Sequence, residues 1–212
     1  MTKGYTQTYG VDYLDTFSLV AKLSIVRVLL SLVANLDWPL HQFDVKNAFL
    51  HGDLEEEVYM KLPLGYMTST KTKVVCKLQR ALYGLKQSPR AWFGQFSLAM
   101  RKYGFKQSNS DHTLFIKHKV GKVIVLIVYV DDMIITGNDE EEITRLHKEL
   151  ATEFEMKNLG GLKYFMGIEV AKSKQGIFIF QRKYVLDILT EVIMLECKPM
   201  DTSIVQNHRL RE

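Results

Sequence analysis

Apolar residues recur along the chain with two spacings, one typical of helices and one typical of strands. Between Leu19 and Leu36 they return every three or four positions, which places them on one face of a helix. Leu40–Val45 has the length of a short strand, and short, nearly continuous apolar runs typical of buried strands lie at Val123–Val130 and Met133–Thr136. Helices and strands therefore follow one another in mixed order, which is typical of an α+β chain with an antiparallel sheet.

Cap and turn residues predict where other elements begin and end. Ser88 is expected to cap a helix that has Pro89 at its first position and Gly104 at its end. Asn138 is expected to begin another helix, with acidic residues in its first turn. The other expected elements are strands at Glu57–Leu62, Val74–Leu78, Thr113–His118, Tyr164–Val170 and Ile177–Phe180, and a last helix at Tyr184–Leu195.

Two adjacent aspartates, Asp131 and Asp132, separate two of the apolar runs. A two-residue hairpin turn normally contains Asn-Gly, Asp-Gly or Gly-X, because these residues tolerate positive φ. Two neighbouring negative charges suit such a turn poorly, and a broken local rule favours a functional site. The alternative is an ordinary solvated Asp-Asp turn.

A third aspartate, Asp44, lies at the end of the strand predicted at Leu40–Val45. Taken alone, it is more typical of a helix N-cap. Together, the carboxylates match phosphoryl transfer to a hydroxyl, which uses two divalent ions about 3.5–4 Å apart. Because Mg²⁺ prefers hard oxygen ligands, carboxylates from adjacent strands suit such a pair. We therefore expect the carboxylates of Asp44 and Asp131 to lie close together.

The segment Ala81–Trp92 combines a glycine with two cations. Gly84 lacks a Cβ and leaves room for a nucleobase or sugar, while Lys86 and Arg90 suit backbone phosphates. The alternative is a loop that leads into a capped helix. That reading explains Ser88-Pro89 but not the Gly-Leu-Lys sequence before it.

Charge and cysteine content only slightly narrow the possible partners, metal sites and cellular compartments of the protein. The net charge of +4 and the pI near 8.9 permit a polyanionic partner without requiring one. Two cysteines without a CxxC pair and six histidines without metal-ligand spacing argue against a zinc site and fit a reducing compartment. The N-terminus lacks a signal-peptide core, and the longest apolar run, Val123–Val130, is too short to span a bilayer. We expect an intracellular protein without a membrane partner.

Four motifs, in this order, resemble the reverse transcriptase of copia-type LTR retrotransposons over nearly the whole chain. They are QFDVKNAFLHGDL at 42–54, VCKLQRALYGLKQSPRAW at 75–92, YVDDMIITG at 129–137 and LGGLKYFMGIEV at 159–170. KGYTQ at 3–7 and QRKYV at 181–185 add weaker support. A single motif is modest evidence, whereas the co-occurrence of all of them is specific.

The resemblance implies an α+β reverse-transcriptase-like polymerase fold with palm, fingers and a partial thumb, in which helices back an antiparallel palm sheet. It implies one reverse transcriptase domain over residues 1–212, truncated at both ends. The implied divisions are fingers and palm at about 1–40 and 50–110, the palm core at 41–49 and 111–170, and the start of the thumb at 171–212.

The resemblance also assigns roles to individual residues. Asp44, Asp131 and Asp132 are implied as the catalytic carboxylates and, with the backbone carbonyl of Val45, as metal ligands. Phe49 is implied as the steric gate under the incoming sugar. The other implied nucleotide-binding residues are Tyr83, Gly84 and Lys157, of which Lys157 equally suits the C-terminus of a helix. The implied template and primer contacts are Lys86, Ser88, Arg90, Tyr129, Met166 and Gly167.

The implied activity is RNA-directed DNA polymerisation, the addition of deoxynucleotides to a primer 3′-hydroxyl with two Mg²⁺ or Mn²⁺ ions. The implied partners are a primed RNA or DNA template, deoxynucleoside triphosphates, and the RNase H and integrase regions of the parent Pol polyprotein. The implied location is the cytoplasm, within a virus-like particle of the parent element, or the nucleus.

The chain departs from the family pattern at several positions. The family continues upstream with a basic fingers strand, and it usually has glycine where Ile193 and Glu196 stand. A catalytically impaired remnant that keeps the fold and at most binds nucleic acid is therefore the first alternative. An RNA-dependent RNA polymerase is a second, against which Phe49 argues, since a ribonucleotide polymerase must admit the 2′-hydroxyl. A structural module without nucleotide dependence is a third.

Overall fold

Helices and antiparallel strands alternate in the computed structural model, which describes residues 4–62, 65–66 and 74–198. The helical elements are η1 (Gly4–Thr6), α1 (Leu23–Leu36), η2 (Ala48–His51), α2 (Ser88–Lys102), α3 (Glu140–Glu153) and α4 (Arg182–Glu191). The strands are β1 (Leu40–Val45), β2 (Tyr59–Lys61), β3 (Val75–Lys77), β4 (Lys106–Gln107), β5 (Leu114–Lys119), β6 (Lys122–Tyr129), β7 (Asp132–Gly137), β8 (Met156–Gly161), β9 (Tyr164–Phe165), β10 (Ile168–Ser173) and β11 (Gly176–Phe180). The expected α+β class is confirmed.

The largest sheet has six strands in the order β4-β5-β6-β7-β1-β8, and each pairing in it is antiparallel. Strand β1, which precedes the other strands of this sheet in the sequence, lies between β7 and β8. This insertion brings the QFDV segment beside the YVDD segment.

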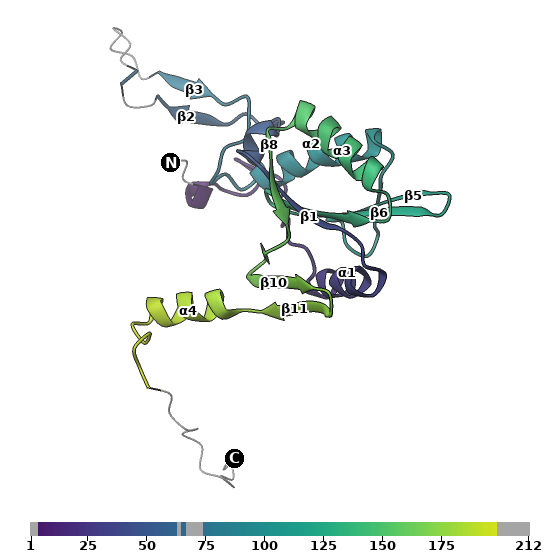
Figure 1. The fold of residues 1–212 in the computed structure, drawn as a ribbon. Helices are drawn as coiled ribbons and strands as arrows, with labels where there is room; N and C mark the ends of the chain where they lie inside the picture. The colour runs from purple at the N-terminus through teal and green to yellow at the C-terminus, as the bar shows by residue number, and fades with distance from the viewer. Residues whose placement is uncertain (1–3, 63–64, 67–73, 199–212) are drawn as a thin grey trace, which may run out of the picture.

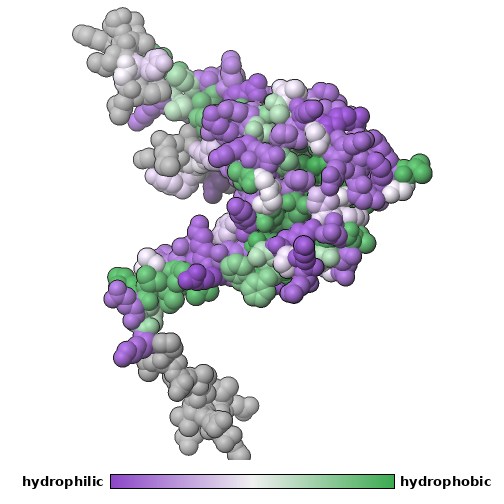
Figure 2. Space-filling view, viewed as in Figure 1, coloured by the Kyte–Doolittle hydropathy of each residue, from purple (hydrophilic) through white to green (hydrophobic). Residues whose placement is uncertain are grey.

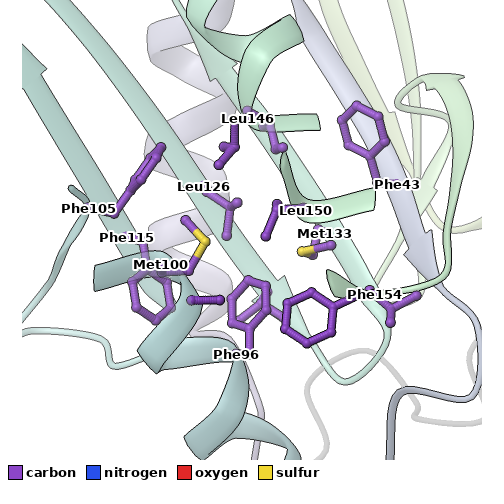
Figure 3. Packing of buried hydrophobic residues seen from close by; sticks show 14 of the residues in the cluster. Phe43, Phe96, Met100, Phe105, Phe115, Leu126, Met133, Leu146, Leu150 and Phe154 are labelled. Carbon is purple, nitrogen blue, oxygen red and sulfur yellow. The ribbon is translucent and has the colours of Figure 1, made fainter. Parts of the chain in front are cut away.

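Both faces of this sheet are buried. Successive residues of a strand point to opposite faces, so each strand contributes to both cores. In β6, Leu126 and Val128 face a core shared with α2 and α3, whereas Val125 and Ile127 face a second core shared with α1 and β9–β10. Figure 1 shows α2 and α3 on one side of the sheet, and α1 with β10 and β11 on the other. Aromatic rings fill much of the first core, where Phe96 packs between Phe115 and Phe154 (Figure 3).

The last part of the described chain extends away from the sheet (Figure 1). Strands β9, β10 and β11 form a separate three-stranded sheet in the order β11-β10-β9. Helix α4 follows it and has no buried side chain. In the part of the chain that the structure describes, no helix has both the length and the apolar character needed to cross a membrane.

Two predicted helix caps are wrong by one residue. Gln87 precedes α2, and Ser88 is its first helical residue, with a hydroxyl that donates to the Leu82 carbonyl at 2.7 Å. Asp139 caps α3 by accepting a hydrogen bond from the Glu142 backbone N–H, whereas the Asn138 side chain bonds back to the β5–β6 turn. Gly104 has the left-handed conformation (φ +82°) expected after the end of α2.

Three element boundaries also differ from the prediction. Helix α1 begins at Leu23 and not at Leu19, because Asp111 accepts a hydrogen bond from the backbone of Lys22 and holds the preceding segment extended. The last helix covers Arg182–Glu191 and not Tyr184–Leu195. The strand predicted at Tyr164–Val170 is divided by a two-residue turn into β9 and β10.

Candidate active site

The candidate site is built from three aspartates at one end of the two central strands. Asp44 in β1 lies directly opposite Asp132, the first residue of β7. Directly opposed residues in an antiparallel pair point to the same face of the sheet. Asp131 is in the turn before Asp132, and its carbonyl accepts a hydrogen bond from the Val45 backbone N–H at 2.8 Å. The fold thus gathers carboxylates from two distant motifs.

The turn between β6 and β7 is strained. Tyr129 pairs with Asp132, so the turn residues are Val130 and Asp131, not the two aspartates that the sequence suggested. Val130 has φ +57°, a conformation that is costly for a β-branched residue. The buried indole of Trp92 donates to the Val130 carbonyl at 2.8 Å and helps to hold this turn.

Burial, together with repulsion between carboxylates, raises the pKa values of Asp44 and Asp132. Burial and then the charge of Asp131 raise the pKa of Asp44, while Lys157 opposes this rise. Burial also raises the pKa of Asp132; a hydrogen bond from Gln42 lowers it, and Asp131 and Asp44 raise it further. A divalent cation at this end of the sheet would relieve this repulsion.

The carboxylates fit a metal site that the substrate completes. Among the described residues, no three His, Cys, Asp or Glu side chains form a ready-made ion site. Mg²⁺ in nucleotide enzymes is usually held by one or two carboxylates, waters and substrate phosphates, so a three-residue protein cage is not required. The paired aspartates supply the hard oxygens, while the role of the Val45 carbonyl stays a prediction.

Phe49 and Tyr83 lie beside the carboxylates. Phe49 is in η2, which follows β1, and its buried ring lies 4.4 Å from the ring of Tyr83. Burial, followed by the charges of Asp131 and Asp44, raises the pKa of Tyr83, and a hydrogen bond to Asp131 adds to this rise. Tyr83 therefore joins the ALYGLKQ segment to the carboxylate cluster.

A long-range contact fixes the glycine of that segment. Gly84 has φ +96°, and a Cβ at Gly4 would lie only 1.8 Å from the Gly84 carbonyl oxygen. The Gln7 side chain accepts a hydrogen bond from the Lys86 backbone N–H at 2.8 Å and donates to Gln87 at 3.0 Å. The N-terminal segment thus holds the loop, a contact that the sequence did not reveal.

The side chains predicted to contact phosphates differ in whether they already have partners within the protein. Lys86 is exposed, and no acidic side chain in the described ranges lies within ion-pair distance of it. Arg90, in contrast, forms ion pairs with three carboxylates: Asp15 at 3.7 Å, Glu55 at 3.4 Å and Glu56 at 2.9 Å. The buried hydroxyl of Ser88 is used inside the protein.

Lys157 lies in β8 directly opposite Asp44, on the other side of β1 from Asp132. Helix α3 ends at Glu153, so Lys157 is not in a helix-terminal turn. Strand β8 was not predicted, because its sequence MKNLGG has little apolar character. Its position comes from pairing with β1, which no local signal reveals.

The remaining predicted residues belong to two neighbouring hairpins. Met166 and Gly167 form the β9–β10 turn, with φ values of +51° and +77°. The ring of Tyr129, at the end of β6, meets that of Phe165 in β9 edge-to-face, with 5.9 Å between their centroids. The β9–β10 hairpin therefore packs next to the carboxylate turn.

Gln42 had no predicted role, although it begins the QFDV motif. It is a buried polar residue two positions before Asp44, on the same face of β1. A glutamine at an inward position of a predicted strand is the signal that could have revealed it.

Comparison with known proteins identifies the class. Residues 1–206 match the family described as "Reverse transcriptase (RNA-dependent DNA polymerase)". The chain belongs to this family.

Its relatives are retrotransposon Pol polyproteins, which confirms the resemblance to copia-type elements. The chain is 40% identical over 210 residues to the "Retrovirus-related Pol polyprotein from transposon RE2" and to that from transposon RE1, both of Arabidopsis thaliana. It is 38% identical over 213 residues to the Pol polyprotein from transposon TNT 1-94 of Nicotiana tabacum. These alignments cover 99% of the chain but only 14–16% of the polyproteins.

Among solved structures, telomerase from Candida albicans, in complex with a fragment of telomeric RNA, is similar at 11% identity and a TM-score of 0.42. The alignment covers 84% of this chain and 38% of that one. That similarity is too low to assign a fold.

Proposed function

We propose that the chain is the core of an RNA-directed DNA polymerase that extends a primer 3′-hydroxyl with deoxynucleotides. The observation that carries this proposal is the register of β1 against β7, which sets Asp44 beside Asp132 with Asp131 in the adjoining turn. Such carboxylates at a strand end, in a chain of the reverse transcriptase family, suit nucleotidyl transfer.

Each residue near the carboxylates has a proposed part. Two bound Mg²⁺ or Mn²⁺ ions would activate the primer hydroxyl and stabilise the leaving pyrophosphate. The carboxylates of Asp44, Asp131 and Asp132 would hold these ions, with the backbone carbonyl of Val45 as a further ligand. In the proposed nucleotide site, Phe49 excludes a 2′-hydroxyl. Tyr83 and Gly84 line the sugar and the base. Lys157 lies beside the pyrophosphate.

We place the template and primer along the same end of the sheet. Figure 2 shows the molecule hollowed on one side, between the main sheet with its helices and the arm formed by β11 and α4. In the proposed division, the main sheet is the palm, β2–β3 belongs to the fingers and α4 begins the thumb. The proposed nucleic-acid contacts are Lys86, Ser88, Arg90, Tyr129, Met166 and Gly167.

Primer extension on poly(rA)–oligo(dT) with Mg²⁺ tests this function. The wild-type chain should incorporate dTTP, and Asp44→Asn or Asp131→Asn should reduce incorporation by at least about a hundredfold, the usual loss for one transition-state electrostatic group. Asp187→Asn, on exposed α4, is the matched control and should not change the rate. Extension that survives Asp44→Asn would refute the site, whereas binding without extension by the wild type would support an impaired remnant.

A further inference from the structure

Gln42 bridges two parts of the molecule that strand pairing does not connect. It lies in β1 and is 7% exposed. Its amide nitrogen donates to Oδ1 of Asp132 at 3.3 Å and to the backbone carbonyl of Tyr164 at 2.9 Å. Asp132 belongs to the six-stranded sheet, whereas Tyr164 belongs to β9 of the separate three-stranded sheet.

The chemistry of the two acceptors fixes the orientation of the amide. A backbone carbonyl and an ionised carboxylate only accept hydrogen bonds, so the NH₂ group must face both of them. The two N–H bonds of Gln42 are then both used. Neither an apolar residue nor a carboxylate of the same length can make this pair of contacts.

The Tyr164 end of this bridge leads into the tight turn of the β9–β10 hairpin. Met166 and Gly167 both have positive φ and form a tight two-residue turn. This turn joins the short paired strands β9 and β10. The hairpin also packs through side chains: Phe165 meets Tyr129 edge-to-face, and Phe165 and Ile168 lie in the core shared with α1. Packing of side chains tolerates sliding, whereas hydrogen bonds are directional, so the bonds of Gln42 constrain the hairpin in a way that this packing does not.

We propose that Gln42 is a positioning residue that fixes the β9–β10 hairpin relative to Asp132, and so aligns the primer end with the carboxylates. This inference rests on the proposed polymerase function, in which the hairpin contacts the primer. Gln42 touches neither substrate nor metal in this role. Its loss should therefore slow the reaction without weakening nucleotide binding.

Gln42→Met tests the bridge, because methionine keeps the length of the side chain and removes both donors. The matched control is Gln107→Met at the far edge of the same sheet, which removes one amide hydrogen bond to the His112 carbonyl (2.8 Å). In hydrogen exchange of the whole chain, Gln42→Met should speed exchange of amides at 164–168 by about tenfold, as expected for one or two lost hydrogen bonds. Amides in α2 and α3 should keep their wild-type rates.

Single-nucleotide addition supplies the second readout. The maximal rate with Gln42→Met should fall by about tenfold or more, while the apparent KM for dTTP changes less than about twofold. A purely structural defect would instead change KM, the melting temperature and exchange in all elements together. The Gln107→Met chain should match wild type in both kinetic values.

The outcomes separate this inference from the proposed function. Unchanged exchange at 164–168 refutes the bridge, and faster exchange with an unchanged rate refutes its positioning role, although the polymerase proposal stands in both cases. If the wild-type chain shows no extension, the proposed function fails. The exchange result alone then decides whether Gln42 anchors the hairpin.

Discussion

Val130 adopts a backbone conformation that valine rarely tolerates, in the turn that joins β6 to β7. Its carbonyl is held by the indole N–H of Trp92. The turn that presents Asp131 is thus held in place from within the core by a side chain of α2. Strain of this kind, of order 1–3 kcal/mol, persists only where the surroundings fix it.

Trp92→Phe should loosen this turn while keeping most of the aromatic packing. We expect primer extension to slow by about tenfold, because small displacements of reacting groups are costly. We expect a loss of about 1–3 kcal/mol in the free energy of unfolding, from the carbonyl left without its donor. Trp38→Phe, an indole before β1, is the control for extension rate, measured under single-turnover conditions. Equal rates for the two variants would contradict the role of Trp92.

Phe49 packs in the core and is also proposed to exclude a 2′-hydroxyl, so a substitution there can change both stability and sugar preference. It is part of the aromatic core, and its ring also packs against that of Tyr83 at an angle of 51°, beside the carboxylates. Phe49→Leu keeps much of the volume but removes the ring edge. We expect ribonucleotide incorporation relative to deoxynucleotide incorporation to rise about tenfold or more, since steric exclusion at a pocket gives discrimination of this order. Phe96→Leu, deep in the same core, should cost stability without changing the sugar preference measured in competition assays.

Ile193 occupies a left-handed position after α4, with φ +58°. The resemblance leads us to expect glycine both there and at Glu196, but of these two positions only Ile193 has a positive φ. Ile193→Gly should therefore stabilise the end of α4 by about 1 kcal/mol, because glycine has no Cβ penalty in this conformation. Amide exchange in α4 should slow about fivefold, whereas Glu196→Gly should give no protection. Protection by both variants, or by neither, would contradict this explanation.

At the scale of elements, the first turn of α3 is tied to β5 through a buried acid. Glu142 forms ion pairs with Lys117 at 2.6 Å, Lys119 at 2.7 Å and Arg145. Burial alone would raise the pKa of Glu142, but hydrogen bonds from the two lysines outweigh it and lower the pKa to about 2 from its usual value of 4.5. Since the folded pKa is depressed, the stabilisation is fully present above the unfolded pKa and is lost as pH falls toward 2.

Glu142→Gln should reduce the free energy of unfolding at pH 7 by on the order of 3 kcal/mol. The difference from wild type should stay constant between about pH 5 and 7 and shrink below pH 4.5, as urea denaturation at several pH values would show. Glu140→Gln, an exposed residue of the same turn, should cost much less. A difference that does not change with pH would mean that the carboxylate charge is not the stabilising group.

Local sequence signals predicted the strands and helices that carry their own pattern, such as β1 and α2. They failed where another element decides the structure. Strand β8 is defined by pairing with β1, and the start of α1 by a hydrogen bond from Lys22 to Asp111. Asp131 and Asp132 stand out in the sequence because they break a local rule, whereas Asp44 drew notice only in combination with them, and their shared catalytic role stays a prediction. The contacts of Gln42 and Trp92 were not, because they depend on partners far along the chain.

At the scale of the whole molecule, one side is hollowed between the main body and the α4 arm (Figure 2). Lys86 and Val130 line the same pocket, so the ALYGLKQ loop and the carboxylate turn meet there. A primed template in this hollow would be held mainly through its phosphates. Its affinity should therefore fall steeply as the salt concentration rises.

The two cations of the ALYGLKQSPR segment should contribute unequally to that affinity. Lys86 is exposed and forms no ion pair in the described part of the chain, so Lys86→Met should lower the slope of log K against log salt by about 1. Arg90 is already neutralised by Asp15, Glu55 and Glu56, and a phosphate would have to displace them. Arg90→Met should therefore change the slope less than Lys86→Met does. It should lower the melting temperature, because the ion pairs of Arg90 join α2 to two other segments of the chain. Fluorescence anisotropy of a labelled primer–template between 50 and 200 mM salt, roughly the range where such slopes are resolved, measures both slopes. Equal slopes for the two variants would show that the phosphate backbone captures Arg90 from its carboxylates on binding.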